Sequence, residues 1–356
     1  MRKAPDFRRF FRFTKDFLEL RGAKRTYSFR ANLYERRDLL VKKGCLVLAL
    51  LVALSTAASA APAELTAVGQ VVGIHLRERA VTVTGFTEDG AAAAAGLCEG
   101  DRIVAVNGQR VTEIAEIAPL LRGGAPVRIA VERGGKPAEF LVPPVACEGG
   151  WLLGIKVRDG ISGIGTVTYY DCESGAYGAL GHGVCAAGAR EPLEMSEGEL
   201  LRATVSGAEK GRRGAAGQLL GTYDAAQPIG TIEKNTEKGI FGYMPAGLTL
   251  GARYPVAAHG EVRTGEATIL ANVSGSTVEA YRAKILKIYP TQSQRNLLLE
   301  VTDPRLLQVT GGILQGMSGS VLLQDGKIIG AVTHVMVSDP TKGYGIFIEN
   351  MLDAAG

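Results

Sequence analysis

A serine in a glycine-rich bend near the end of the chain has the surroundings that a nucleophile needs. Ser318 lies in the pentapeptide Gly-Met-Ser-Gly-Ser, which begins at Gly316. Small neighbours let a carbonyl carbon approach the serine Oγ atom, and the backbone N–H groups of Gly316 and Ser318 can face a developing oxyanion. Asp325-Gly326, between two apolar runs, predicts a tight hairpin directly after the bend. A glycine turn alone would give the same short motif, so the order of the whole segment decides the interpretation.

Residues 316–352 resemble the C-terminal part of chymotrypsin-like serine proteases. The shared order is a Gly-x-Ser-Gly bend, a hairpin, a strand, a loop, a further strand and a short last helix. The resemblance implies that Ser318 is the nucleophile and that Gly312 gives the specificity pocket an uncharged floor. It also implies that three residues of the strand after the hairpin flank the substrate: Thr333, His334 and Val335.

A histidine in a small-residue turn supplies a candidate general base. His182 lies in Gly-Ala-Leu-Gly-His-Gly at residues 178–183, after a strand rich in tyrosine. Taken alone, this pattern favours a structural histidine. Because Ser318 follows it in the chain, as in the chymotrypsin-like order, we interpret His182 as the base. Cys185, Ser320 and His334 are weaker candidates for catalysis.

The length and charge of the chain limit its class. It has 356 residues, of which 46% are hydrophobic and 47 are glycine, enough for two compact domains and a tail. The net charge is +4, but residues 1–43 hold 14 Lys and Arg against 5 Asp and Glu, so residues 44–356 carry about −5. A negatively charged body excludes nucleic acid as a partner.

An uncharged stretch at residues 44–61 follows the basic segment. Lys42-Lys43 before it fit the positive-inside rule, and Ala58-Ser59-Ala60 has the form of a signal-peptidase site. The stretch therefore predicts either a cleaved secretory signal or an uncleaved signal anchor in a membrane. Residues 1–43 are then a basic cytoplasmic tail or an over-extended start, and the rest of the chain is exported.

The five cysteines show no C-x-x-C pair and no metal spacing, and there are only four histidines. No metal or cofactor is predicted. Outside the cytoplasm one disulfide could form among four of the cysteines, with no pairing specified: Cys98, Cys147, Cys172 and Cys185.

Residues 66–145 resemble a PDZ domain. The resemblance rests on Ala-Gly-Leu at residues 95–97 and on Gly-Asp-x-Ile-x-x-Val-Asn-Gly at residues 100–108. Such a module binds an extended peptide as an added strand beside a helix, here residues 114–121. The resemblance implies a carboxylate-binding turn near Val72, Gly73 and Ile74.

Residues 151–356 predict an all-β domain, because short apolar runs recur between glycine turns. The predicted fold class is therefore mainly β: a PDZ-like α/β module followed by a chymotrypsin-like double β-barrel, both preceded by an N-terminal signal or anchor helix.

Several stretches together resemble the stage IV sporulation protein B (SpoIVB) peptidases of endospore-forming bacteria. They are GALGHG at 178–183, EKGIFG at 237–242, EVRTGEATIL at 261–270, LLLEVTDPRLLQVTGG at 297–312, and QGMSGS at 315–320 with the segment up to residue 352. The resemblance implies a serine peptidase in the space between the two membranes around the forespore. There it cleaves a membrane-bound regulatory complex and so triggers activation of the late mother-cell sigma factor. It also implies that the PDZ groove binds a target peptide or a segment of the protein itself.

The resemblance also implies that Asp303 completes a triad with Ser318 and His182. The spacing in chymotrypsin-like folds fits Asp224 better, because it lies between His182 and Ser318 and far ahead of the serine. In that case Asp303 caps the turn that follows it. Two other functions remain open: an envelope quality-control protease with a PDZ sensor, and a PDZ scaffold without catalysis.

Overall fold

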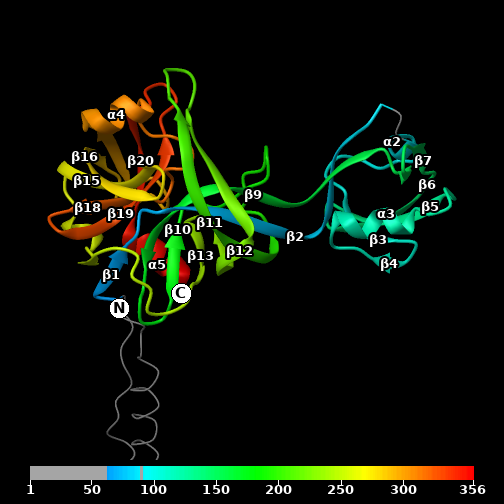
Figure 1. The fold of residues 1–356 in the computed structure, drawn as a ribbon, viewed down its shortest axis with the longest axis horizontal. Helices are drawn as coiled ribbons and strands as arrows, with labels where there is room; N and C mark the ends of the chain where they lie inside the picture. Colours follow the sequence, from blue (N-terminus) through cyan, green and yellow to red (C-terminus); the bar gives the residue numbers. More distant parts are fainter. Residues whose placement is uncertain (1–61, 89–90) are drawn as a thin grey trace, which may run out of the picture. The chain divides into compact units, whose positions relative to one another are not determined.

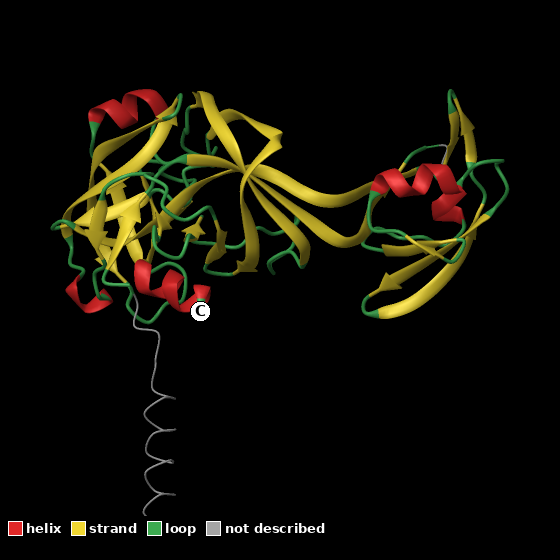
Figure 2. Cartoon of the chain, turned by 60° about the horizontal axis from the view of Figure 1, so that its bottom comes forward, coloured by secondary structure: helices red, strands yellow, loops and turns green. Residues whose placement is uncertain are grey.

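The computed structural model describes residues 62–88 and 91–356, and strands make up most of them (Figures 1 and 2). The predicted basic tail at 1–43 and the predicted signal or anchor at 44–61 lie outside the described residues. Among the described residues, no helix is long and apolar enough to cross a membrane. Cys98, Cys147, Cys172 and Cys185 are all free thiols, so the possible disulfide is not present.

The first barrel is a closed ring of strands. Its members are β2 (Val71–Phe86), β9 (Ile155–Tyr170), β10 (Ala176–Ala179), β13 (Gly239–Tyr243), β12 (Gln218–Thr236) and β11 (Met195–Glu209). The ring closes because β9 pairs with β10 on one side and with β2 on the other, while β11 joins β2 to β12. Outside the ring, β1 (Glu64–Ala67) pairs with the end of β9 and with β14 (Arg253–Pro255). The barrel buries Tyr170, Tyr177 and many aliphatic side chains.

The second barrel is also closed. Its strands follow the order β15 (Gly265–Ser274), β16 (Thr277–Ile288), β17 (Leu297–Val301), β20 (Lys342–Phe347), β19 (Lys327–Val335) and β18 (Val321–Gln324). The predicted hairpin joins β18 to β19, with Asp325 and Gly326 both at positive φ as a primed turn requires. The helical segments of this part of the chain are η3 (His259–Glu261), α4 (Pro304–Thr310) and α5 (Ile348–Ala355). The predicted double barrel is therefore present.

The PDZ-like module is formed mainly by residues between β2 and β9 in the chain, and the second half of β2 and the beginning of β9 belong to its sheet. Its sheet has the order β9, β2, β3 (Arg102–Val106), β5 (Val127–Arg133) and β6 (Lys136–Val142), and β4 (Gln109–Arg110) pairs with β3. The remaining elements are α2 (Ala91–Ala94), η2 (Ile114–Glu116), α3 (Ile117–Leu120), β7 (Val145–Cys147) and β8 (Gly150–Leu152). A turn at Asn107-Gly108 joins β3 to β4, and both residues adopt positive φ.

The strand β2 corrects the predicted start of the PDZ module. Its first half, including Val72, Gly73 and Ile74, pairs with β11 and with the second half of β9 in the first barrel. Its second half pairs with β3 and with the beginning of β9 in the PDZ sheet. Val72, Gly73 and Ile74 therefore belong to the peptidase barrel and cannot form a carboxylate-binding turn of the PDZ module.

Candidate active site

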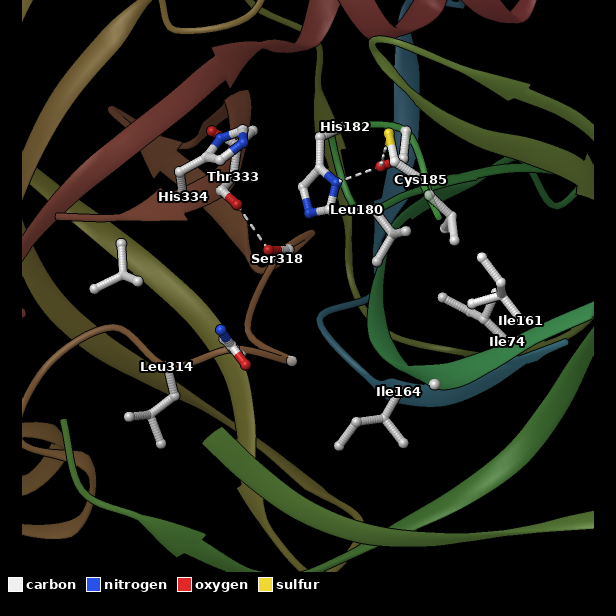
Figure 3. A pocket seen from close by; sticks show the side chains of 16 residues that line it. Ile74, Ile161, Ile164, Leu180, His182, Cys185, Leu314, Ser318, Thr333 and His334 are labelled. Carbon is white, nitrogen blue, oxygen red and sulfur yellow. Dashed lines mark hydrogen bonds between the residues drawn. The ribbon is translucent and has the colours of Figure 1, made fainter. Parts of the chain in front are cut away.

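A cavity of about 420 Å³ is lined by residues of both barrels, and it contains the candidate nucleophile and the candidate base (Figure 3). Ser318 comes from the bend before β18, and His182 comes from the turn after β10. Thr333, His334 and Val335 of β19 also line the cavity, as predicted for residues beside a substrate. The structure thus brings together residues that are far apart in the chain.

The bend that carries Ser318 is fixed by the strand β9 of the other barrel. The Thr166 N–H donates to the Ser318 carbonyl at 3.0 Å, and the Thr166 hydroxyl donates to the Gly316 carbonyl at 2.9 Å. Gly319 has a φ of 98°, and a Cβ atom there would collide with the Thr166 carbonyl oxygen. Glycine is therefore required beside the serine so that the bend can pack against β9.

Two backbone donors in this bend are free of partners. No described residue accepts a hydrogen bond from the N–H of Gly316 or from that of Ser318. In the same bend, the Gly319 N–H donates to Val332 and the Ser320 N–H donates to Met317. Free donors beside a nucleophile suit the stabilisation of an oxyanion, so the assignment of Gly316 and Ser318 to an oxyanion hole stays a supported prediction.

The hydroxyl of Ser318 is occupied by a backbone acceptor. Its Oγ donates to the Thr333 carbonyl oxygen at 2.7 Å. Thr333 is itself held in β19, because its hydroxyl donates to the Tyr344 carbonyl at 3.1 Å. The candidate nucleophile is therefore in a defined position at the rim of β19.

The turn before His182 has an unusual backbone. Leu180 has a φ of 68° and Gly181 has a φ of 71°, so two successive residues are left-handed. Leu180 is a bulky residue for which this conformation is costly, and such strain is common where a turn aims a functional side chain. A Cβ atom at Gly181 would lie 2.8 Å from the Thr333 Cγ2 atom, so this turn and β19 approach closely.

The hydrogen bond of His182 determines which ring nitrogen carries the proton. His182 Nδ1 lies 2.9 Å from the Gly183 carbonyl oxygen. Because a carbonyl can only accept, Nδ1 carries the proton and Nε2 keeps a lone pair. In Figure 3 the Nε2 side of the ring is turned toward Ser318. Burial lowers the pKa of His182 below its usual 6.5, so the imidazole is neutral at pH 7. A neutral imidazole with a free Nε2 is the form that a general base requires.

His334 lies next to His182 but has a different environment. The two ring centroids are 5.1 Å apart at an interplanar angle of 42°. His334 Nδ1 is buried and has no hydrogen-bond partner among the described residues. Burial, His182 and Arg295 lower the pKa of His334 to about 4. It is a neutral wall residue at pH 7 and is less suited than His182 to take a proton.

The structure does not bring Asp303 to His182. Asp303 is the N-cap of α4, and its carboxylate accepts hydrogen bonds from the backbone N–H groups of Arg305 and Arg282 and from the Arg305 guanidinium. These bonds hold the pKa of Asp303 well below its usual range. The alternative, Asp224, is exposed on β12, where its Oδ1 accepts from the Ala226 N–H. Neither aspartate lines the cavity, and the acceptor at His182 Nδ1 is the Gly183 carbonyl.

The other candidates are placed as follows. Cys185 lines the cavity, but burial and the nearby Glu237 raise the pKa of its thiol, which leaves it a poor nucleophile. Ser320 is fully buried, and its hydroxyl has no partner among the described residues. Gly312 is buried against Pro340 and is absent from the cavity lining, so it does not form the floor.

Sequence reasoning missed the contribution of the first barrel to the cavity. Ile74 of β2 and Ile161, Gly163 and Ile164 of β9 all line it. The glycine-rich run at residues 160–165 was the available signal, since a glycine inside a strand often marks a close approach or an open position. Nothing in the sequence connected that run to Ser318.

Family models and curated proteins give matches over different parts of the chain. The model of the SpoIVB peptidase S55 family matches residues 149–352, and a PDZ domain model matches residues 82–133. A stretch of 63 residues is 41% identical to the zinc metalloprotease RasP of Geobacillus kaustophilus, and it covers 17% of this chain and 15% of that protein. A stretch of 81 residues is 36% identical to the putative zinc metalloprotease Atu1380 of Agrobacterium fabrum and covers 22% of each chain. The chain thus spans less than a quarter of these relatives.

Solved structures of proteases also resemble the chain weakly. The active form of the Rv3671c protease from M. tuberculosis has a TM-score of 0.35 at 15% identity, and the match covers 55% of this chain and 75% of that one. The HtrA-type protease AlgW with a decapeptide has a TM-score of 0.34 at 11% identity, over 82% of this chain and 64% of that one. At these scores the likeness supports no statement about substrate or partner.

Proposed function

Since the chain belongs to the SpoIVB peptidase S55 family and is a serine endopeptidase, we propose that Ser318 is its nucleophile and His182 its general base. The observation that carries this assignment is their position in one cavity, with His182 Nε2 free and turned toward the serine. The runner-up nucleophile, Cys185, has a thiol whose pKa is raised. The unpaired N–H groups of Gly316 and Ser318 supply the oxyanion hole.

The first chemical step follows from this arrangement. Ser318 Oγ leaves the Thr333 carbonyl, transfers its proton to His182 Nε2 and forms a bond to the carbonyl carbon of the substrate. The carbonyl oxygen becomes an oxyanion that accepts from the two free N–H groups. The oxyanion then collapses, the C–N bond breaks, and His182 gives the proton to the leaving amine, which leaves an acyl ester on Ser318. Water, deprotonated by His182, attacks this ester, the bond to Ser318 Oγ breaks, and the proton returns to the serine as the acid product leaves.

The Gly183 carbonyl takes the orienting role that a carboxylate has in a triad. It accepts from His182 Nδ1 and so fixes the tautomer with a free Nε2. A neutral carbonyl stabilises the transient imidazolium less than a carboxylate does. Burial weakens the stabilisation of the imidazolium further, because it also disfavours the charged ring. The site therefore works as a Ser–His dyad with a backbone partner.

The proposed biological role is supported by family membership. The peptidase is exported, acts near a membrane in the space around the forespore, and cleaves a membrane-bound regulatory protein. That cleavage leads to activation of the late mother-cell sigma factor. The family match supports this role over the two alternatives, an envelope quality-control protease and a scaffold without catalysis.

A peptide partner on the PDZ module is also part of the proposal, at a new position. The beginning of β9, Ile155–Arg158, is the end strand of the PDZ sheet and pairs only with β2 there. The helical segment after Glu113 lies beside this strand, since the Ile114 N–H donates to Asp159 Oδ2 at 2.9 Å. A free strand edge next to a helix is where a PDZ module adds a peptide strand. Hydrogen exchange should slow at Ile155–Arg158 when a peptide selected from a C-terminal library binds.

Two experiments test the function separately. A fluorophosphonate probe should label the purified full chain and should fail to label Ser318→Ala. In the source bacterium, replacement of the chromosomal copy by Ser318→Ala should reduce heat-resistant spores to the level of a deletion. Labelling together with a wild-type spore count would retain the serine peptidase and reject the sporulation role.

A further inference from the structure

The wall of the proposed catalytic cavity is mostly apolar, and its polar side chains, among them Gln315 and Thr333, carry no charge. Aliphatic side chains of both barrels line the cavity: Ile74, Ile161, Ile164, Leu180, Leu314 and Val335. Figure 3 labels the first five, which lie on several sides of Ser318. No Asp, Glu, Lys or Arg side chain of the described residues lines the cavity. The two histidines in the wall are neutral at pH 7, because both have lowered pKa values.

We propose that this cavity binds an aliphatic side chain of the substrate beside the cleaved bond, and that the β2–β9 pair determines this specificity. The inference rests on the proposed function, since it places the substrate at Ser318. It extends that function because the selecting residues belong to β2 and β9 of the first barrel and not to the bend or to β19. A charged side chain would lose its hydration here without gaining a partner, whereas an aliphatic one would bury apolar surface.

The β2–β9 wall has a defined geometry. Ile74 pairs in register with Gly163, and Gly73 pairs with Ile164, so the lining residues are fixed by a continuous strand ladder. Ile74 is 4% exposed and is part of the barrel core, which prevents it from moving out of the way. The shape of this wall is therefore set by the fold before a substrate arrives.

Gly163 is the open position in that wall. It lines the cavity, its φ is not positive, and a Cβ atom built there meets nothing within 4 Å. A side chain at this position would therefore grow into the space that the substrate uses, without backbone strain. Gly207 of β11 also lacks a positive φ, and a Cβ atom built there also meets nothing within 4 Å. Because Gly207 does not line the cavity, it is a matched control.

Diphenyl phosphonate probes test the inference on the full chain. Each probe carries one side chain next to phosphorus. Ser318 Oγ forms a bond to phosphorus, a P–O bond breaks, and phenolate leaves while His182 accepts the serine proton. We expect the valine- and leucine-like probes to react at least about 10-fold faster than the glutamate- and ornithine-like probes, because a charged group loses its hydration in this cavity without gaining an ionic partner. Equal rates, or faster reaction of a charged probe, would overturn the inference.

The variants locate the specificity. Gly163→Leu should lower the labelling rate of the leucine-like probe relative to a fluorophosphonate by about 10-fold or more, and Gly207→Leu should leave this ratio unchanged. An unchanged ratio in Gly163→Leu would place the selecting residues elsewhere. Absence of fluorophosphonate labelling in the wild-type chain would instead reject the proposed nucleophile, and the inference with it, so the two failures are distinguishable.

Discussion

The Ser318 hydroxyl donates a hydrogen bond to the Thr333 carbonyl oxygen at 2.7 Å, so β19 holds the hydroxyl of the proposed nucleophile in the absence of substrate. Catalysis requires that this hydrogen bond breaks and that the proton passes to His182. A hydrogen bond of this kind contributes about 1 kcal/mol net, which substrate binding can readily offset.

Ser318→Ala should abolish proteolysis and probe labelling while it lowers the free energy of unfolding by only about 1 kcal/mol, the value of one hydrogen bond. The matched control is Ser320→Ala, two residues away. It removes a buried hydroxyl that has no partner in the described part of the chain, so it should keep full activity and leave stability equal or higher. Denaturant unfolding measures the stability of the two variants, and active-site labelling measures their activity. Loss of activity in Ser320→Ala would show that the nucleophile was assigned to the wrong serine.

The pH profile should report His182. The base must be neutral, and burial lowers its pKa below 6.5. Protonation of His182 should therefore remove activity on the acid side, with the midpoint of the acid limb of kcat/KM below pH 6.5. His182→Gln should reduce kcat by about 10²- to 10⁴-fold, the usual contribution of a general base. An acid limb centred above pH 6.5 would contradict the buried, neutral imidazole.

Asp303 should be a stability residue. Asp303→Ala removes the N-cap of α4 and leaves the Arg282 N–H without its acceptor, at a cost of about 3 kcal/mol. Asp303→Asn keeps a capping oxygen and should melt at an intermediate temperature with nearly unchanged turnover per folded molecule. Because the pKa of Asp303 is lowered, its contribution is present above pH 3.8 and is lost as the pH falls further. A large fall in kcat for a fully folded Asp303→Asn would instead show that Asp303 acts with Ser318 and His182 as the third member of a catalytic triad.

His334 should make the fold sensitive to acid. Its pKa is about 4 in the folded chain and about 6.5 when unfolded, so the unfolded chain binds more protons between these values. Stability should therefore fall as the pH drops from 6.5 to 4, by roughly 2 kcal/mol once solvent screening of the partly open ring is allowed for. The melting temperature of His334→Leu should change less over this range. Equal pH dependence in both chains would assign the effect to other groups.

Ser318 and His182 could be proposed as a catalytic pair from the sequence because both residues lie in short local patterns. A glycine bend followed by a primed hairpin turn identifies Ser318 from a few neighbours, and the small-residue turn does the same for His182. The helix-start pattern of Asp303-Pro304 was equally visible, since an N-cap aspartate followed by proline at N1 is a common helix beginning. The family resemblance implied a catalytic role for Asp303, whereas the local pattern predicts the N-cap that the structure shows.

The wall of the cavity and the start of the PDZ module were not predictable, because both depend on pairing between distant strands. β2 is one continuous strand whose two apolar halves are separated by Arg77-Glu78-Arg79, and this charged stretch does not show that one half pairs in the barrel and the other in the PDZ sheet. Ile74 and Gly163 become neighbours only through the register of β2 with β9. A pattern that alternates every second residue gives the face of a strand but does not identify its partner.

The insertion of the PDZ-like module into the β2–β9 pair has a consequence for the order of folding. Val71 of β2 pairs with Thr166 of β9 in the first barrel, and the whole module is synthesised between these two residues. The pair can therefore form only after the module has been synthesised. Closing so long a loop costs chain entropy and slows folding. If the module folds first, it brings the two halves of the pair together and removes most of that cost. Substitutions that destabilise the module would then delay barrel closure and lower the yield of active peptidase, even where they touch neither the cavity nor a bound peptide.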